Sequence, residues 1–261
     1  SMVFTGTASA DNNVASNWTV ASSREPTTNL SDEGSPGIRG SDQTTAVRRP
    51  MDGVAGWRFV SPPKGGLTVQ YLADQGFVQG VQESNPSGDV NVYLRYNPPN
   101  GSENSSSEEY WEPAADVTDA LERGRGVLWY LWKQDVPSFL TSTGSIGGIS
   151  TDQTVSGLGD HKWHLLGNPF PNDFRIGDIT STAFATTAQV WVPNQGTYQT
   201  VGPGLATEAV GSQVGFFLER TSGIGGGSPA SVTFSASGQS LEAETITRKS
   251  AGSQGRVSLA M

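Results

Sequence analysis

The chain has 261 residues, a formal net charge of −9, and no cysteine, which excludes disulfides, thiolate metal sites and a cysteine nucleophile. Its 16 Lys and Arg are scattered rather than grouped, which argues against nucleic acid or an anionic membrane surface as a partner. No apolar run approaches the roughly 20 residues that a membrane-spanning helix requires, so membrane insertion is excluded as well.

The composition, with 33 Gly and 15 Pro, predicts many turns and few long helices. Residues 1–53 are polar, and we expect them to form an N-terminal arm or short strands. Order is predicted to begin at "GWRFVSPP" (56–63), an apolar strand ended by two prolines. The next segment, "LTVQYLADQGFVQG" (67–80), reads as a strand that runs into one helical turn.

Three further elements complete a first unit. "DVNVYLRYN" (89–97) alternates apolar and polar residues, which predicts a half-buried strand. "DVTDALERGRG" (116–126) is the best short-helix candidate, with Asp116 or Thr118 as its cap and a glycine stop. "VLWYLW" (127–132) is continuously apolar, which predicts a strand buried on both faces.

The same pattern then recurs, and the recurrence indicates an internal duplication. "HKWHLLGNPFP" (161–171) corresponds to "AGWRFVSPP" (55–63), and Asn168-Pro169 forms a stiff corner whose counterpart is "SPP". "GSQVGFFLE" (211–219) aligns with "GRGVLWYLW" (124–132), so that Gly211 matches Gly124 and Phe216 matches Trp129. Two unrelated β stretches of similar composition are the alternative interpretation.

These patterns predict an all-β chain. We expect two related antiparallel β-sandwich or jelly-roll-like units that arise from an internal duplication, with few short helices. The predicted divisions are an arm at 1–53, a first unit at 54–150, a second unit at 151–240, and a C-terminal strand or linker to a further domain at 241–261.

Several of these segments resemble a recurrent region of large secreted proteins from the Bacteroidota, many of which carry a C-terminal type IX secretion signal. In that region "GW-x-L-L-G-N-P-[FY]-P" precedes a "V-[YW]-V-x-[DN]" strand and a "G-Q-x-F-F-V" strand, and the match covers roughly residues 55–240. Gly215 stands where the family commonly has Ala. The resemblance implies export, an all-β fold and a place in a multidomain secreted or cell-surface protein. It implies no chemistry, because the function of the region is generally unknown.

Both histidines of the chain, His161 and His164, lie in one motif. On a strand, residues three apart point to opposite faces, so the two rings could not chelate one ion. With no third histidine, aspartate or glutamate residues such as Asp160 or Asp173 would have to complete a zinc site. No G-x-S-x-G elbow accompanies them, which disfavours a serine hydrolase. We therefore assign no catalytic residue, leave the metal open, and keep Ca²⁺ bound by acidic loops as the one possible cofactor.

Aromatic residues in apolar strands, namely Trp57, Trp129, Trp163 and Phe216, are expected in the core. Other aromatic residues lie near turns and polar loops, where their flat faces could stack on sugars. The predicted ligand-binding residues are these aromatics and nearby polar residues: Trp111, Tyr110, Trp191, Tyr198, Arg95, Asn97, Asn194 and Gln195. The leading hypothesis is a non-catalytic module that binds polysaccharide or a cell-surface glycan, or serves adhesion.

Two alternatives stay open at this point. The first is a polysaccharide-active enzyme, a glycoside hydrolase or lyase, that uses carboxylates around Trp111, because such an enzyme needs only a positioned pair of carboxylates. The candidates are Glu108, Glu109, Glu112, Asp116 and Asp119. The second is a purely structural spacer, whose partners would be only the neighbouring domains of a larger chain.

Overall fold

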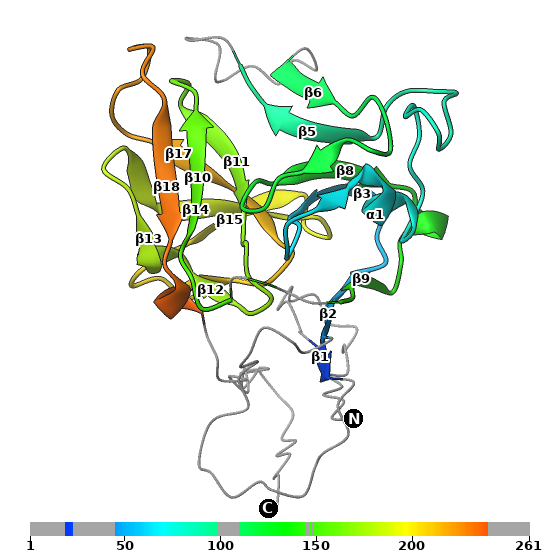
Figure 1. Cartoon of the computed structure of the whole chain (residues 1–261), viewed down its shortest axis with the longest axis horizontal. Coiled ribbons are helices and arrows are strands. Elements are labelled where there is room, and N and C mark those ends of the chain that lie inside the picture. The colour runs from blue at the N-terminus through cyan, green and yellow to red at the C-terminus, as the bar shows by residue number, and fades with distance from the viewer. Residues whose placement is uncertain (1–18, 23–44, 99–109, 145–146, 148, 240–261) are drawn as a thin grey trace, which may run out of the picture.

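The computed structural model describes residues 19–22, 45–98, 110–144, 147 and 149–239 (Figure 1). Strands dominate these residues, and α1 (Val69–Ala73) is the one α-helix among them. Every pairing between the strands described is antiparallel. The all-β prediction is therefore confirmed. The predictions for 241–261 and for most of 1–53 lie outside the described residues.

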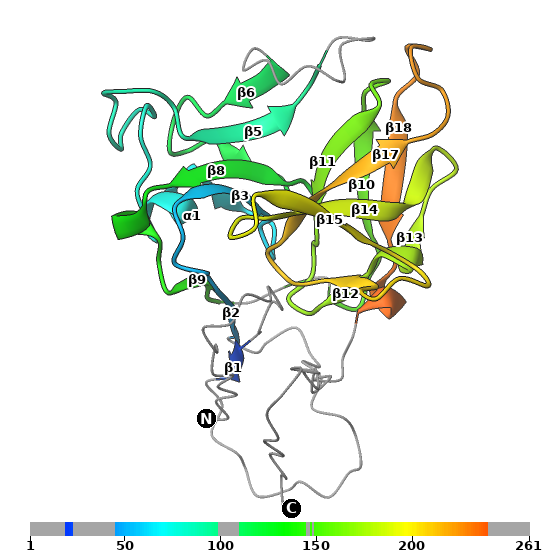
Figure 2. The same cartoon turned by 180° about the vertical axis from the view of Figure 1, so that it is seen from behind.

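Two four-stranded sheets form the centre of the molecule (Figures 1 and 2). The first has the order β3-β8-β5-β6, and the second has the order β11-β17-β14-β15. In both sheets the first strand along the chain lies beside the fourth, and the fourth lies beside the second. Their bounds are β3 (Gly56–Val60), β5 (Val92–Tyr96), β6 (Trp111–Pro113), β8 (Val127–Leu131), β11 (Trp163–Gly167), β14 (Phe184–Val192), β15 (Thr197–Val201) and β17 (Gly215–Arg220).

Smaller sheets surround this pair, and their orders are β1-β2-β9, β10-β18-β13, β12-β16 and β4-β7. Because β2 pairs with β9, residues 45–50 belong to the folded part of the chain. The bounds are β1 (Thr19–Ser22), β2 (Thr45–Pro50), β4 (Leu67–Thr68), β7 (Ala120–Leu121), β9 (Phe139–Ser142), β10 (Gln153–Leu158), β12 (Phe174–Arg175), β13 (Ile179–Thr180), β16 (Ala209–Val210) and β18 (Ala230–Phe234), with short 3₁₀ turns at η2 (Lys133–Asp135), η3 (Ile176–Asp178) and η4 (Ala236–Gly238).

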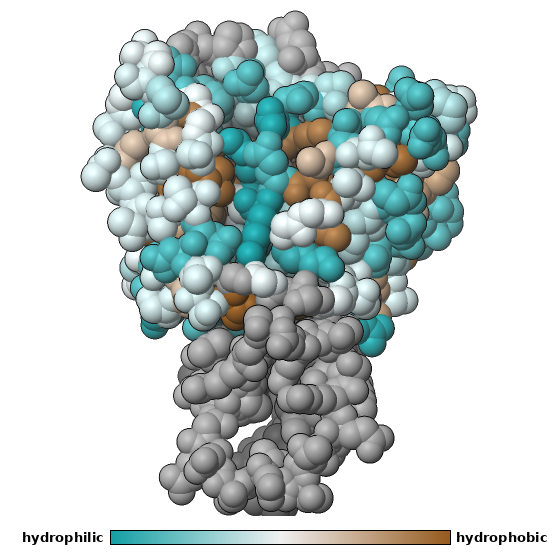
Figure 3. Space-filling model, in the orientation of Figure 1, coloured by the Kyte–Doolittle hydropathy of each residue, from teal (hydrophilic) through white to brown (hydrophobic). Residues whose placement is uncertain are grey.

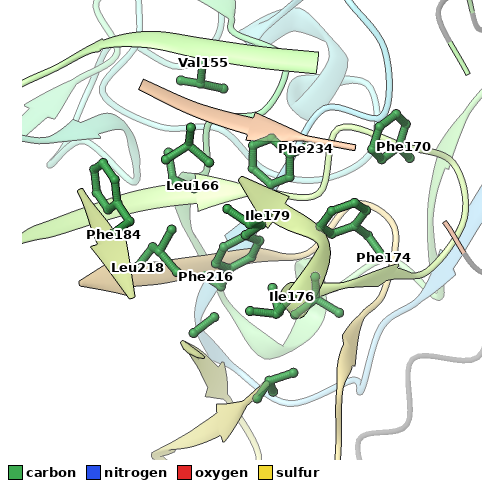
Figure 4. Packing of buried hydrophobic residues seen from close by; sticks show 14 of the residues in the cluster. Val155, Leu166, Phe170, Phe174, Ile176, Ile179, Phe184, Phe216, Leu218 and Phe234 are labelled. Atoms are coloured by element: carbon green, nitrogen blue, oxygen red, sulfur yellow. The ribbon is translucent and has the colours of Figure 1, made fainter. Parts of the chain in front are cut away.

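Each half of the chain has its own apolar core. The core of the first half includes Val60, Leu140 and the fully buried Trp129. The core of the second half is rich in phenylalanine and includes Phe174 and Phe216, which lie among Leu166, Ile176 and Phe234 in Figure 4. Burying one such side chain contributes about 1.5–3 kcal/mol. Both β8 and β17 are almost entirely buried, as predicted for the continuously apolar "VLWYLW".

The two units meet through reciprocal backbone hydrogen bonds. The amide of Ser61 donates to the carbonyl of Gln213 at 3.1 Å, and the amide of Gly167 donates to the carbonyl of Gly124 at 3.0 Å. When Trp57 is matched to Trp163, Ser61 matches Gly167, so each bond is the counterpart of the other. The arrangement is that of an approximate two-fold axis, for which a duplication is our proposed explanation.

The structure corrects the alignment of the two units by two residues. Phe59 pairs with Leu128 in the first sheet, and its counterpart Leu165 pairs with Phe217 in the second. Gly126 is thus the counterpart of Gly215, whereas the sequence alignment matched Gly124 with Gly211. The apolar pattern cannot reveal such a slip, because a shift of two residues leaves every side chain on the same face of the strand.

Close backbone approach at the junction explains both glycines. A Cβ on Gly126 would lie 2.6 Å from the carbonyl oxygen of Leu166, and a Cβ on Gly215 would lie 3.0 Å from the Cβ of Phe59. The second contact gives a physical reason for glycine at position 215. The two sheets can therefore cross with their main chains in contact.

The predicted helix at 116–126 is wrong. The segment forms a tight turn followed by β7, and its aspartates bond the turn itself. The carboxylate of Asp119 accepts hydrogen bonds from the amides of Ala115 at 2.7 Å and Asp116 at 3.0 Å. The amide and hydroxyl of Thr118 both donate to Asp116. Aspartate and threonine compete for backbone groups in this way, which favours turns over helices.

The "GNPFP" corner is confirmed. Asn168 is fully buried, its amide nitrogen donates to the carbonyl of Asn172 at 2.7 Å, and its side-chain oxygen accepts from the amide of Phe170 at 2.9 Å. The hydroxyl of Ser61 donates to the carbonyl of Asn168 at 3.0 Å, so the two matching corners touch each other at the junction.

Candidate functional site

Aromatic side chains gather where the two four-stranded sheets face each other. Four buried residues form the base of this junction cluster, two from each sheet: Phe59, Leu128, Leu165 and Phe217. Five partly buried aromatic residues pack against them: Tyr93, Tyr96, Trp111, Trp163 and Trp191. Because both sheets contribute, the cluster depends on the junction and belongs to neither unit alone.

A β-bulge in β5 directs two tyrosines toward this cluster. Tyr93 pairs with Pro113, yet Arg95 pairs with Glu112, so β5 uses one residue more than β6. The extra residue reverses the alternation of faces, as bulges do. The rings of Tyr93 and Tyr96 consequently both contact Trp111, with centroids 6.2 and 4.8 Å away.

Phe217 links the aromatic residues of the strand pair β5–β6 to those of the strand pair β14–β15. Its ring lies 5.4 Å from Tyr96 and 6.2 Å from Trp111 on the first sheet. On the other side it lies 6.3 Å from Tyr198, whose exposed fraction is 47%. Tyr198 in turn contacts Trp191 at 5.1 Å. The sequence-predicted residues Trp111, Trp191 and Tyr198 are therefore brought to one place.

Trp57 departs from its expected place in the core, because 37% of its surface is exposed. It shares a face with Phe59 but lies near the N-terminal end of β3, where the centroid of its ring is 5.8 Å from that of Tyr93. The indole nitrogen of Trp191 donates to the carbonyl of Trp57 at 3.0 Å and fixes one sheet against the other. Trp163, the counterpart of Trp57, is also only partly buried, whereas Trp129 and Phe216 are fully buried as expected.

A hollow of about 200 Å³ adjoins the cluster, between β5 and the segment that leads into β11. We call it the junction hollow. Its lining is mostly polar and includes Arg95, Tyr96, Asn97, Glu112, Arg125, His161 and His164. Hydrophilic residues also form a stripe down the middle of the face shown in Figure 3, where the two units meet.

The remaining predicted residues lie in two separate places. Asn97 is exposed, and its backbone amide donates to the backbone carbonyl of Tyr110 at 2.7 Å. Tyr110 is partly buried. Asn194 and Gln195 occupy the turn between β14 and β15, and neither lines the hollow. The predicted polar set is thus divided, with Arg95 and Asn97 at the hollow.

Ion pairs hold the charged groups of the hollow. Arg95 bonds Glu122 and lies 3.6 Å from the carboxylate of Glu112, while Arg125 lies 2.5 Å from Glu122. Burial raises the pKa of Glu122, but the charges and hydrogen bonds of Arg125 and Arg95 outweigh that effect and leave its pKa below the usual value. Glu122 is therefore an ionised acceptor, which does not suit the general acid of a glycosidase.

The histidine prediction was wrong in its geometry. His161 precedes β11 and does not follow the alternation of the strand, so its ring stacks on that of His164 with centroids 3.9 Å apart. The Nε2 of His164 donates to the carbonyl of His161 at 3.1 Å. Burial, with a smaller contribution from His161, lowers the pKa of His164 to about 3, so the ring is neutral near pH 7. No cluster of three potential metal ligands occurs among the residues that the structure describes.

Of the carboxylates proposed for an enzyme, the structure describes Glu112, Asp116 and Asp119, and the two aspartates bond a turn away from Glu112. Glu108 and Glu109 lie outside the described residues. Asp116 and Asp119 bond the turn before β7, and hydrogen bonds from Thr118 lower the pKa of Asp116. Glu112 remains at the hollow, where it faces Arg95.

Sequence reasoning missed several residues of the site, chiefly Tyr93, Tyr96, Phe217, Glu122 and Arg125. A signal for the tyrosines was present, since they flank Arg95 on one strand, but only the bulge places them on one face. The two charged residues were hidden by their assignment to a helix.

Comparisons with protein-family models, curated proteins and solved structures gave no match. Within the described part of the chain, no helix has the length and apolar character needed to cross a membrane.

Proposed function

We propose that this chain is a non-catalytic carbohydrate-binding module of a secreted or cell-surface protein. The observation that carries the proposal is the gathering of partly exposed aromatic rings from both sheets beside a hollow lined by arginine, asparagine and glutamate. The resemblance to exported Bacteroidota proteins supports the location and the expectation of neighbouring domains.

Sugars require two kinds of contact, and the site offers both. Their C–H faces stack on flat aromatic rings, and their hydroxyls need donors and acceptors. Tyr198 and Trp57 offer exposed aromatic surface, while Arg95, Asn97 and Glu112 offer exposed polar groups.

The rings are also held in place before any ligand binds. Trp111 is fixed by contacts to Tyr93, Tyr96 and Phe217, and Trp191 by its hydrogen bond to Trp57. Side chains that are already ordered lose little conformational entropy on binding, so more of the contact energy contributes to affinity.

The proposal is tested by a glycan array followed by affinity gel electrophoresis on soluble polysaccharides. We expect Trp111→Ala and Tyr198→Ala each to weaken binding by about 1–3 kcal/mol, the range found when an aromatic ring stacked on a base is truncated. Thermal unfolding of each variant separates loss of binding from loss of fold.

Trp132→Ala is the matched control. Trp132 is partly buried and packs on Phe77 and Tyr130, outside the junction cluster. Equal losses in Trp111→Ala and Trp132→Ala, or no retention of the wild-type chain by any polysaccharide, would contradict the proposal. Release of reducing ends or unsaturated sugars would replace it with a catalytic function.

A further inference from the structure

The arginine and glutamate charges around the junction hollow balance one another. Arg95 and Arg125 supply two positive charges, and Glu112 and Glu122 supply two negative charges. Both arginines contact Glu122, and Arg95 faces Glu112 as well. Neither guanidinium is therefore an uncompensated cation. The ring of His164 adds no charge near pH 7, because its pKa lies far below that range.

This balance opposes an anionic ligand. A carboxylate or sulfate that approached Arg95 would have to displace a glutamate or lie next to Glu112 and Glu122, and like charges in a partly desolvated site repel strongly. The chain as a whole carries a net charge of −9, which adds a repulsive field around any polyanion.

The same groups suit an uncharged, hydroxyl-rich ligand. The side chains of Arg95 and Glu112 are 47% and 51% exposed, so N–H groups and carboxylate lone pairs remain accessible beside each other. A sugar hydroxyl both donates and accepts, and it can bond such a pair without disturbing the ion pair. Asn97, also at the hollow, combines a donor and an acceptor in one amide.

The size of the hollow points to one sugar unit. Its volume of about 200 Å³ is smaller than the roughly 300–1,000 Å³ of sites that enclose a drug-sized ligand. The adjoining rings of Tyr96 and Trp111 continue beyond it, so further units of a glycan can lie along the junction cluster.

We infer that the junction hollow holds one uncharged sugar unit of a neutral glycan, with Arg95 and Glu112 as its hydrogen-bonding pair, and that the site discriminates against uronate and sulfated glycans. This inference rests on the proposed function and adds the class of ligand. It requires no metal ion and no chemical step.

The test compares two sets of polysaccharides by affinity gel electrophoresis and calorimetry, at 50 mM and 300 mM NaCl. The neutral set is β-glucan, mannan and arabinoxylan, and the acidic set is alginate, polygalacturonate and carrageenan. We expect at least one neutral polymer to bind with an affinity that changes less than about twofold between the two salt concentrations, because no counterions are released. Acidic polymers should bind at least about tenfold more weakly, the ratio that 1.4 kcal/mol produces.

Variants then test the role of the charge balance. Glu112→Gln leaves Arg95 with one carboxylate partner fewer, so we expect acidic polymers to gain at least about threefold in affinity and to become salt-sensitive. Asp178→Asn is the control, because it removes the carboxylate of an exposed ion pair with Arg175 outside the hollow, and it should leave both sets unchanged. Thermal unfolding confirms that each variant is folded.

The outcomes separate the two ideas. Preferential, salt-weakened binding of acidic polymers by the wild-type chain would overturn the inference and leave the proposed function intact. Binding of neither set would overturn the proposed function and the inference with it. If neutral polymers bind but Glu112→Gln gains no affinity for acidic polymers, the charge balance is refuted as the source of discrimination.

Discussion

Replacing Gln213 should reveal how strongly the two units are joined. This residue is fully buried and has a φ of 58°, a left-handed conformation that its counterpart Gly124 shares with a φ of 84°. The Gln213 amide nitrogen donates to the carbonyls of Val47 at 3.3 Å and Leu140 at 3.1 Å, and the Tyr71 hydroxyl donates to its side-chain oxygen at 2.5 Å.

Two substitutions separate the side chain from the backbone. Gln213→Ala and Gln213→Gly both delete three side-chain hydrogen bonds and leave buried partners unsatisfied, and each such bond or group accounts for about 1 kcal/mol, so the loss is about 2–4 kcal/mol. Alanine must also keep the left-handed φ, whereas glycine adopts it freely, and that difference amounts to roughly 1 kcal/mol. We therefore expect Gln213→Gly to be the more stable of the two variants.

The assay is urea unfolding followed by tryptophan fluorescence, with Gln199→Ala as the control. Gln199 is exposed and makes a single side-chain bond to Thr207, so its loss should change the free energy of unfolding by no more than about 0.5 kcal/mol. If Gln213→Ala unfolds at the same urea concentration as the control, the buried network contributes nothing. If it is more stable than Gln213→Gly, the backbone argument is refuted.

Two more predictions concern the junction. The pKa of His164 is about 3 in the folded chain and near 6.5 in the unfolded chain, so the unfolded state binds an extra proton between these two pH values. The free energy of unfolding should therefore fall by up to about 1.4 kcal/mol for each pH unit below pH 6.5. Above pH 6.5 this group should leave the stability unchanged. Acid titration of stability in His164→Gln should show a flatter slope over that range, and an unchanged slope would exclude the histidine as its source. Gly126→Ala places a methyl group against the carbonyl of Leu166 and should destabilise the chain by about 1–3 kcal/mol, whereas exposed Gly65→Ala, with nothing within 4 Å, should be nearly neutral in thermal unfolding. Equal melting temperatures for the two glycine variants would contradict the close approach.

Strands and corners were accessible to sequence reasoning because their signals are local. The prolines after Val60 and Asn168 stop their strands whatever the rest of the chain does, and the apolar run at 127–132 can only be buried. The binding hypothesis also started from a local signal, namely aromatic residues next to polar hairpin residues, and the structure brings Trp111, Trp191 and Tyr198 to one junction.

The features that sequence reasoning missed depend on distant parts of the chain or on small shifts. The segment at 116–126 has a helical pattern, but Asp119 bonds two nearby amides and stabilises a turn instead. The bulge in β5 adds one residue without leaving a mark in the apolar alternation. The stacking of His161 on His164 follows from the exact start of β11, and strand boundaries are the least certain part of any sequence pattern.

The hydrogen bonds across the junction also affect when this site can form during folding. Arg49 donates to the carbonyl of Gln213 across 164 residues of chain, so the contact requires closure of a very long loop. Contacts of such high sequence separation form slowly, and a ribosome supplies the second partner last. Neither half of the chain can complete the aromatic surface by itself. The surface should thus mature only after β17 has been synthesised, and until then Phe59 and Leu128 remain open to premature association with other chains.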